Sequence, residues 1–296
     1  MYDLRTIDEK ESGLNYYPRP QLKRNTDDGF YLNLNGKWDY TITNEFRISD
    51  IDNYKFDKII VPYPLESKLS NVGIRLPKDH FLVYKKEFCF HNKLNRTILH
   101  IGACSSETMV FLNNKFLLNN LGGYLPIDID ITDDLLEENV LIIVASNSLN
   151  NHYPYGKQKN NNSGIWYTPS TGIWKTVWLE SVDDNYIKDL KIKTDINKKE
   201  LYLKIKSNYN KYHIKVLFNQ EIIINDNYQG EDITIKFNDI KLWDTENANL
   251  YDLIIENEYD RIESYFGFRE IRIENDKVLL NNKRIFMHGL LDQGFY

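Results

Sequence analysis

Paired carboxylates are the first groups in this sequence that could do chemistry, because two acids held together can act as general acid and general base. The adjacent acids include Asp27-Asp28, Asp133-Asp134, Glu137-Glu138 and Asp183-Asp184. Neighbouring side chains in a turn or strand point apart. These pairs are therefore better interpreted as solvated turns than as catalytic pairs.

Histidine and cysteine provide no metal site. The spacing typical of metal ligands is missing among the six histidines, which are His80, His91, His100, His152, His213 and His288. His100 lies in an expected strand and is interpreted as a structural residue. The two cysteines, Cys89 and Cys104, are too few for a disulfide framework, and both lie in apolar runs, so buried free thiols are expected. No cofactor is expected.

Aromatic side chains are the more promising binding groups. The chain has 21 Tyr and 5 Trp, which suits both strand-rich structure and contact with carbohydrate, where flat rings stack on sugar faces. Trp174 and Trp178 share one face of an expected strand whose other face is also apolar, which favours burial. The segment 151–155 is the better exposed candidate. The full set of candidate platforms is Tyr124, Tyr153, Tyr155, Trp166, Tyr167 and Trp174.

Strand patterns dominate the chain, and helical periodicity is nearly absent. Residues 187–193 alternate apolar and polar side chains, as a half-buried strand requires. Three two-residue turns, Asn35-Gly36, Asn113-Asn114 and Asn281-Asn282, are predicted to form tight β-hairpins, because Asn and Gly tolerate positive φ best. The long stretch 147–163 carries turn residues only, and a loop of that length in a folded domain is often functional.

Length and charge narrow the class of protein. A chain of 296 residues fits two domains, and the polar cluster at 181–185 predicts a boundary near 182. The net charge of −6 offers no footprint for nucleic acid or an anionic membrane. The N-terminus has no apolar signal region, and no stretch is apolar enough to span a membrane, so a cytoplasmic location is expected.

Eight short segments occur in an order that is informative when they are taken together. They include Leu34-Asn35-Gly36-Lys37-Trp38, Val61-Pro62, Val83-Tyr84-Lys85-Lys86-Glu87-Phe88, Ala103, Gly122-Gly123-Tyr124-Leu125-Pro126, Gly172-Ile173-Trp174, Leu242-Trp243 and Phe266-Gly267-Phe268-Arg269. Together they resemble family 2 glycoside hydrolases, the group of β-galactosidases, β-glucuronidases and β-mannosidases. The chain departs from the family pattern at Ser105 and Asn120, where relatives often carry Asp and His. Near its end, Leu291-Asp292-Gln293-Gly294 is similar to one subgroup.

The resemblance implies an all-β fold in three parts: a jelly-roll sugar-binding domain at 1–182, an immunoglobulin-like sandwich at 183–271, and the start of a (β/α)8 barrel at 272–296, with its first strand at 284–290. Retaining glycosidases need two carboxyl groups about 5 Å apart, carried in a barrel at the ends of several strands. The resemblance implies that both are glutamates on later barrel strands. No catalytic residue is therefore expected in this sequence.

Three functions remain open. The chain is interpreted first as the non-catalytic front region of a retaining, β-galactosidase-like β-glycosidase, inactive alone. The alternatives are a stand-alone carbohydrate-binding module and an assembly partner. The expected partners are a β-glycoside carbohydrate and either a catalytic barrel or a second copy of the chain, with no nucleic acid and no membrane. The residues expected to contact substrate are Trp166, Tyr167, Tyr153, Tyr155, Asn120, His288 and Gln293.

Overall fold

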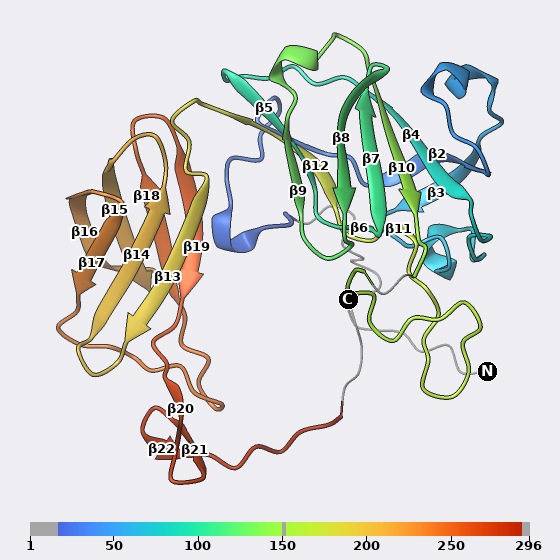
Figure 1. Cartoon of the computed structure of the whole chain (residues 1–296). Coiled ribbons are helices and arrows are strands. Elements are labelled where there is room, and N and C mark those ends of the chain that lie inside the picture. Colours follow the sequence, from blue (N-terminus) through green and yellow to red (C-terminus); the bar gives the residue numbers. More distant parts are fainter. Residues whose placement is uncertain (1–16, 150–151, 292–296) are drawn as a thin grey trace. The chain divides into compact units, whose positions relative to one another are not determined.

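The computed structural model describes residues 17–149 and 152–291, and the chain divides into two units (Figure 1). The first unit holds residues 26–182 with those up to Pro18, and the second holds 183 onward with residues 19–25. In the described ranges regular structure is mostly antiparallel strand, which confirms the all-β class. The 3₁₀ helices found there are short: η2 (Pro20–Leu22), η3 (Ile48–Asn53), η4 (Lys68–Ser70) and η5 (Thr132–Asp134).

The first unit is a sandwich of two antiparallel sheets with a small third one. The six-stranded sheet has the order β3-β2-β4-β10-β7-β8, the four-stranded sheet β1-β12-β5-β9, and the small sheet β11-β6. The strands are β1 (Tyr31–Asn33), β2 (Gly36–Thr43), β3 (Asp57–Val61), β4 (Phe81–Phe88), β5 (Arg96–Ile101), β6 (Cys104–Ser105), β7 (Glu107–Leu112), β8 (Lys115–Leu121), β9 (Ile127–Asp130), β10 (Asn139–Ser146), β11 (Gly172–Ile173) and β12 (Val177–Val182).

Strand β10 is buried on both faces, which explains its continuous apolar run. Leu141 and Ile143 face the core between the two large sheets, where they meet side chains of β5, β9 and β12. Ile142 and Val144 point the other way, into a smaller cluster that contains Ile51 of η3. A half-buried strand would alternate apolar and polar residues; this one has no solvent face.

The second unit is a smaller sandwich. A sheet of order β13-β14-β17 faces one of order β16-β15-β18-β19, and a separate three-stranded sheet β20-β21-β22 follows. The strands are β13 (Asp189–Asp195), β14 (Glu200–Lys206), β15 (Lys211–Phe218), β16 (Glu221–Gln229), β17 (Asp232–Lys236), β18 (Tyr251–Glu256), β19 (Arg261–Phe266), β20 (Ile271–Glu274), β21 (Lys277–Leu280) and β22 (Lys283–Arg284).

Residues 19–25 belong to this second unit although residues 26–182 of the first unit separate them from the rest of it in sequence. Lys23 and Glu263 of β19 exchange both backbone hydrogen bonds, at 2.9 and 2.8 Å. Leu22 is buried in the core of the second sandwich. The buried Arg24 forms an ion pair with Asp260 at 3.2 Å and donates to the carbonyl of Ile187. A buried charge is stable only when paired and hydrogen-bonded, so this segment is held specifically.

Two of the three predicted hairpins are confirmed. The turn at Asn113-Asn114 joins β7 to β8, with φ of 51° and 66°. The turn at Asn281-Asn282 joins β21 to β22 with the same pair of values. Both central residues are therefore left-handed, as a type I′ turn requires.

The prediction of a hairpin at Asn35-Gly36 is wrong. Strand β1 pairs with β12, whereas β2 pairs with β3 and β4 in the other large sheet. The Asn35 side chain accepts a hydrogen bond from the Val177 amide at 3.1 Å and donates to Thr176 Oγ1 at 3.2 Å. Gly36, with φ of 104°, thus turns the chain from one sheet into the other.

Two further expectations need correction. Cys89 is exposed, because its neighbours Phe88 and Phe90 both point into the core and leave the intervening side chain outside, whereas Cys104 is buried as expected. A strand at 284–290 is not formed beyond Arg284 of β22. A lone strand has no neighbour to satisfy its backbone groups, and Leu290 is 97% exposed.

Substitution within the aromatic cluster of the second sandwich tests how its core is packed. Phe268 is fully buried and makes edge-to-face contacts with the rings of Phe237, Tyr251 and Phe266 at 5.1 to 5.6 Å. We expect Phe268→Ala to lower the free energy of unfolding by about 3–5 kcal/mol, since it leaves a cavity. Urea denaturation measures this change. Tyr265→Ala, at a side chain that is 45% exposed on β19, should cost less than about 0.5 kcal/mol; equal losses would contradict the packing described.

Candidate functional site

A polar pocket lies at one end of the six-stranded sheet in the first unit. Strands β2 and β10 end there, and β4 and β7 begin there, since Thr43 pairs with Phe81 and Ser146 with Glu107. The cavity has a volume of about 530 Å³, within the range of small-ligand sites. It is lined by Asn44, Leu76, Pro77, Lys78, Asp79, His80, Phe81, Glu107, Ser146, Asn147, Ser148 and Asn160.

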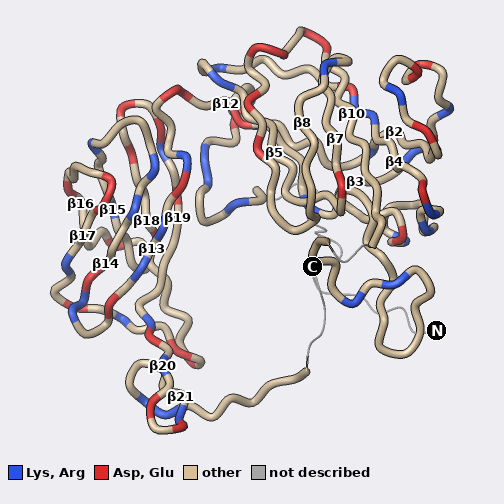
Figure 2. The backbone as a smooth tube through the Cα atoms, viewed as in Figure 1, with Lys and Arg blue, Asp and Glu red and all other residues tan. Residues whose placement is uncertain are grey.

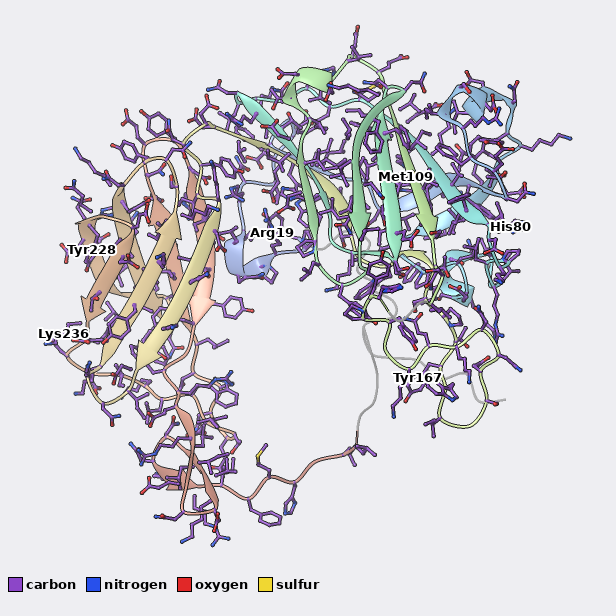
Figure 3. All side chains as sticks on the ribbon, viewed as in Figure 1. Arg19, His80, Met109, Tyr167, Tyr228 and Lys236 are labelled. Carbon is purple, nitrogen blue, oxygen red and sulfur yellow. The ribbon has the colours of Figure 1, made fainter. Side chains whose placement is uncertain are left out.

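Several side chains of this pocket have fixed orientations. Glu107 Oε2 accepts a hydrogen bond from Ser146 Oγ at 3.3 Å. His80 Nδ1 lies 2.8 Å from the carbonyl oxygen of Lys78, and Figure 3 labels this histidine. A carbonyl only accepts, so Nδ1 carries the proton, and Nε2 of the neutral ring is an acceptor. Amide, carboxylate and imidazole groups side by side suit a ligand rich in hydroxyl groups.

The long loop 147–171 forms one wall of the pocket and is held by polar contacts. Arg75 donates to the carbonyl of Asn160 and to the Asn162 side chain. Gln158, only 5% exposed, donates to the carbonyl of Tyr155 at 2.6 Å and accepts from the Ser170 amide at 2.6 Å. The loop has no strand ladder to satisfy these backbone groups, so side chains do so.

Glu66 anchors the end of this loop. Its carboxylate accepts hydrogen bonds from the Thr171 amide at 2.8 Å and from Thr171 Oγ1 at 2.6 Å. Burial raises the pKa of the Glu66 carboxyl, and the Thr171 hydrogen bonds and the charge of Arg75 oppose that rise. The next residue, Gly172, has φ of 83°, and a Cβ there would lie 2.1 Å from Tyr84 Oη. Only glycine fits this approach to the core.

Two aromatic residues of the loop differ in exposure, since Trp166 is half-buried and Tyr167 is exposed. The ammonium of Lys159 lies 4.9 Å from the centroid of the Trp166 ring, a cation–π contact. Tyr167 is 37% exposed, and its backbone exchanges hydrogen bonds with Lys157 and Lys159 at 2.8 and 3.0 Å; Figure 3 labels it on the loop. Rings on a tethered loop can stack on a sugar without much further ordering.

A second aromatic pair lies beside the double glycine Gly122-Gly123. Trp174 Nε1 donates to the carbonyl of Gly123 at 2.8 Å, and its ring meets that of Tyr124 at 5.9 Å, edge to face. Burial raises the pKa of Tyr124, and a hydrogen bond with Gln158 opposes the rise. These rings are therefore committed to packing, and Trp178 is buried, as the sequence indicated.

The structure brings most of the predicted site residues into the first unit. Tyr153 and Tyr155 are half-buried in the same loop as Trp166 and Tyr167. Asn120 is on β8, and its amide donates to the carbonyl of Gly122 at 3.0 Å, which closes a turn.

The other two predicted site residues, His288 and Gln293, are not among the described residues of the first unit. His288 belongs to the second unit, where it is exposed and contacts Phe286. Gln293 lies outside the described residues. The sequence analysis did not identify Glu66, Arg75 and Gln158 as residues that hold the loop. The one available signal was that each is a polar residue in a segment rich in turn residues.

His100 has the structural role that the sequence suggested. It is buried, stacks on Trp178 at 4.7 Å, and its Nδ1 lies 2.6 Å from Asp128 Oδ1. The buried Glu180 beside it accepts from Tyr17 Oη at 2.6 Å and from Trp178 Nε1 at 3.0 Å. Over the described ranges no three His, Cys, Asp or Glu side chains are grouped to hold a metal ion, and no helix there is long and apolar enough to cross a membrane.

Comparison with known proteins shows which family this chain resembles. The model of glycosyl hydrolases family 2 matches residues 176–269. A β-galactosidase of Thermoanaerobacterium thermosulfurigenes is 26% identical over 87% of this chain and 39% of its own length. A putative β-glucuronidase of Formosa agariphila is 27% identical over 87% of this chain and 33% of its own length. The chain is therefore similar to glycosyl hydrolases of family 2, most directly over residues 176–269.

Solved structures of family 2 enzymes share the fold. The β-glucuronidase of Ruminococcus gnavus superimposes with a TM-score of 0.70 over 94% of this chain and 53% of that protein, at 19% identity. A β-glucuronidase of an uncultured Clostridium has a TM-score of 0.66 over 88% of this chain. This chain thus spans about half the length of the solved relatives and between 28% and 51% of the length of the curated relatives.

The raised pKa of Glu66 predicts a pH dependence of stability. The folded state binds this proton more tightly than the unfolded chain, whose glutamate titrates near 4.5. The wild type therefore loses free energy of unfolding as pH rises from below 4.5 through the raised value. In Glu66→Gln the amide oxygen still accepts from the Thr171 amide and the NH₂ donates to Oγ1, with no titration. We expect denaturation at stepped pH to show a smaller loss in the variant; identical slopes would rule this out.

Proposed function

We propose that this chain is the non-catalytic N-terminal region of a retaining β-glycosidase of family 2, and that it has no hydrolytic activity alone. The supporting observation is the alignment of 87% of the chain with 39% of a β-galactosidase. In this proposal residues 1–182 are the sugar-binding domain, 183–271 the immunoglobulin-like domain, and 272–296 the beginning of a (β/α)8 barrel that would carry the two catalytic carboxylates.

The first unit would contact the substrate through loop 147–171. This is supported by the exposed ring of Tyr167, by the half-buried Trp166 in the same loop, and by the polar pocket that the loop helps to enclose. The substrate class is a β-glycoside, as the names of the relatives suggest. The fixed amide and carboxylate groups would bind sugar hydroxyls, and such groups position a substrate without taking part in bond cleavage.

Contact with a catalytic barrel would involve the exposed apolar side chains of the last strands. Ile271 and Ile273 of β20 lie on the surface, as do Phe286 and Met287. These exposed side chains would supply apolar area to such a contact. A second copy of the chain is the alternative occupant, and the dependence of mass on concentration would distinguish the two.

Hydrolysis of a panel of chromogenic β-glycosides tests the main proposal. We expect the purified 296-residue chain to turn over none of the galactoside, glucuronide, mannoside and glucoside, because the barrel carboxylates are needed to stabilise the oxocarbenium-like transition state. A complete family 2 enzyme is the positive control. Turnover that persists after repurification would place a catalytic pair in this chain and reject the proposal.

A stand-alone carbohydrate-binding module is the second candidate, and the cation–π pair of Lys159 and Trp166 on an outward loop favours it. Here the chain itself would bind β-glycosides at equilibrium. We expect Trp166→Ala to weaken such binding at least tenfold, which corresponds to about 1.4 kcal/mol. Calorimetric titration with lactose measures it. The matched control is Tyr265→Ala in the other unit, and unchanged affinity in Trp166→Ala would remove the loop from consideration.

A further inference from the structure

A second concave site lies in the other unit, away from everything assigned above. It is on the outer face of the sheet β16-β15-β18-β19 and has a volume of about 570 Å³. Figure 3 labels one of its residues, Tyr228 on β16. The lining residues are Tyr209, Lys211, Tyr212, His213, Asn227, Tyr228, Gln229, Glu256, Asn257 and Glu258.

An aromatic ring forms one side of this cavity. Tyr209 lies in the connection between β14 and β15, and its ring meets that of Tyr259 edge to face at 5.2 Å. Its hydroxyl lies 3.4 Å from Glu258 Oε2. The ring is thus supported from behind and oriented at its polar end, which is how tyrosine presents a flat apolar face to a ligand.

The floor is a row of planar polar side chains. His213 Nδ1 lies 2.9 Å from Asn227 Oδ1, and Nε2 lies 3.0 Å from Asn225 Oδ1. A neutral imidazole donates from one nitrogen only, so one of the two amides must turn its NH₂ toward the ring. The remaining groups of the Asn227 amide, with those of Gln229, are then available to a ligand. The Asn257 amide is instead occupied by hydrogen bonds with the backbone of Asn185, Tyr259 and Asp260.

The charges at the cavity nearly cancel. Lys211 is opposed by Glu258, and the Glu256 carboxylate is bound by Arg261 at 2.8 Å and by Lys215 at 3.4 Å. Figure 2 shows the same interspersion of Lys and Arg with Asp and Glu over the strands of this unit. A site without excess positive charge does not attract phosphate or a polyanion.

We propose that this cavity binds a neutral hexose unit of a β-linked oligosaccharide. A flat ring, two amides, an imidazole and nearly balanced charges together match a ligand with an apolar face and a rim of hydroxyl groups. The site lies in a different unit from loop 147–171 and does not depend on the chain being part of a glycosidase. It would give the protein a second point of attachment to a polymeric substrate.

The test is calorimetric titration of the full 296-residue chain with cellobiose and lactose, and with glucuronate as an anionic comparison. We expect binding of at least one neutral disaccharide, weaker binding of glucuronate, and a loss of at least tenfold in Tyr209→Ala. His213→Ala should weaken binding too, and it replaces Tyr209→Ala as the test variant if Tyr209→Ala fails to fold. The matched control is Tyr265→Ala, an exposed tyrosine on the same sheet outside the cavity.

Either of two results would overturn the proposal. One is that neither neutral disaccharide binds the wild type. The other is that disaccharide binding persists in the folded Tyr209→Ala and His213→Ala variants. If Trp166→Ala then abolishes the binding, the binding site lies in the first unit. Because hydrolysis is not measured here, failure of this site is separate from failure of the proposed function.

Discussion

The first unit is organised by the burial of β10 on both faces. Strand β10 pairs with β4 on one side and with β7 on the other, and a separate layer must cover its outer face. Segment 44–56, with Phe46, Ile51 and Tyr54, supplies that layer. Each fully buried apolar side chain contributes about 1.5–3 kcal/mol, so β10 and its neighbours form the rigid base at whose end the pocket is built.

Loop 147–171, in contrast to the strands, is held by polar contacts more than by apolar packing. Loop 147–171 is positioned by Arg75, Gln158 and Glu66, which hold backbone groups or turn residues that no strand pairs. This arrangement suits a binding surface, because a loop held by a few hydrogen bonds presents its rings without burying them. The second unit has a similar division, with an aromatic core inside and a polar, amide-rich outer face.

Much of the fold could be predicted from local pattern, and the failures have physical causes. The turns at Asn113-Asn114 and Asn281-Asn282 were recognisable because positive φ at two successive residues is a local demand. Asn35-Gly36 carries the same signal, but hydrogen bonds to Thr176 and Val177, which are far away in sequence, decide which sheet the chain enters after the turn. The candidate loop was visible from its length and turn residues. Its anchors were not, since the partnership of Glu66 with Thr171 spans 105 residues.

The assignment of residues 19–25 to the second sandwich makes that sandwich a split domain, interrupted by residues 26–182 of the first unit. On the ribosome, Arg24 emerges long before Asp260, which follows it by 236 residues. The first unit can therefore acquire its fold while the second still waits for its closing strand, and that late long-range closure is the kind of step that slows folding. Dissection has a matching requirement. An isolated second domain cut at 183 would keep the buried Asp260 without its guanidinium partner, so the excised domain must carry residues 19–25 as a grafted peptide.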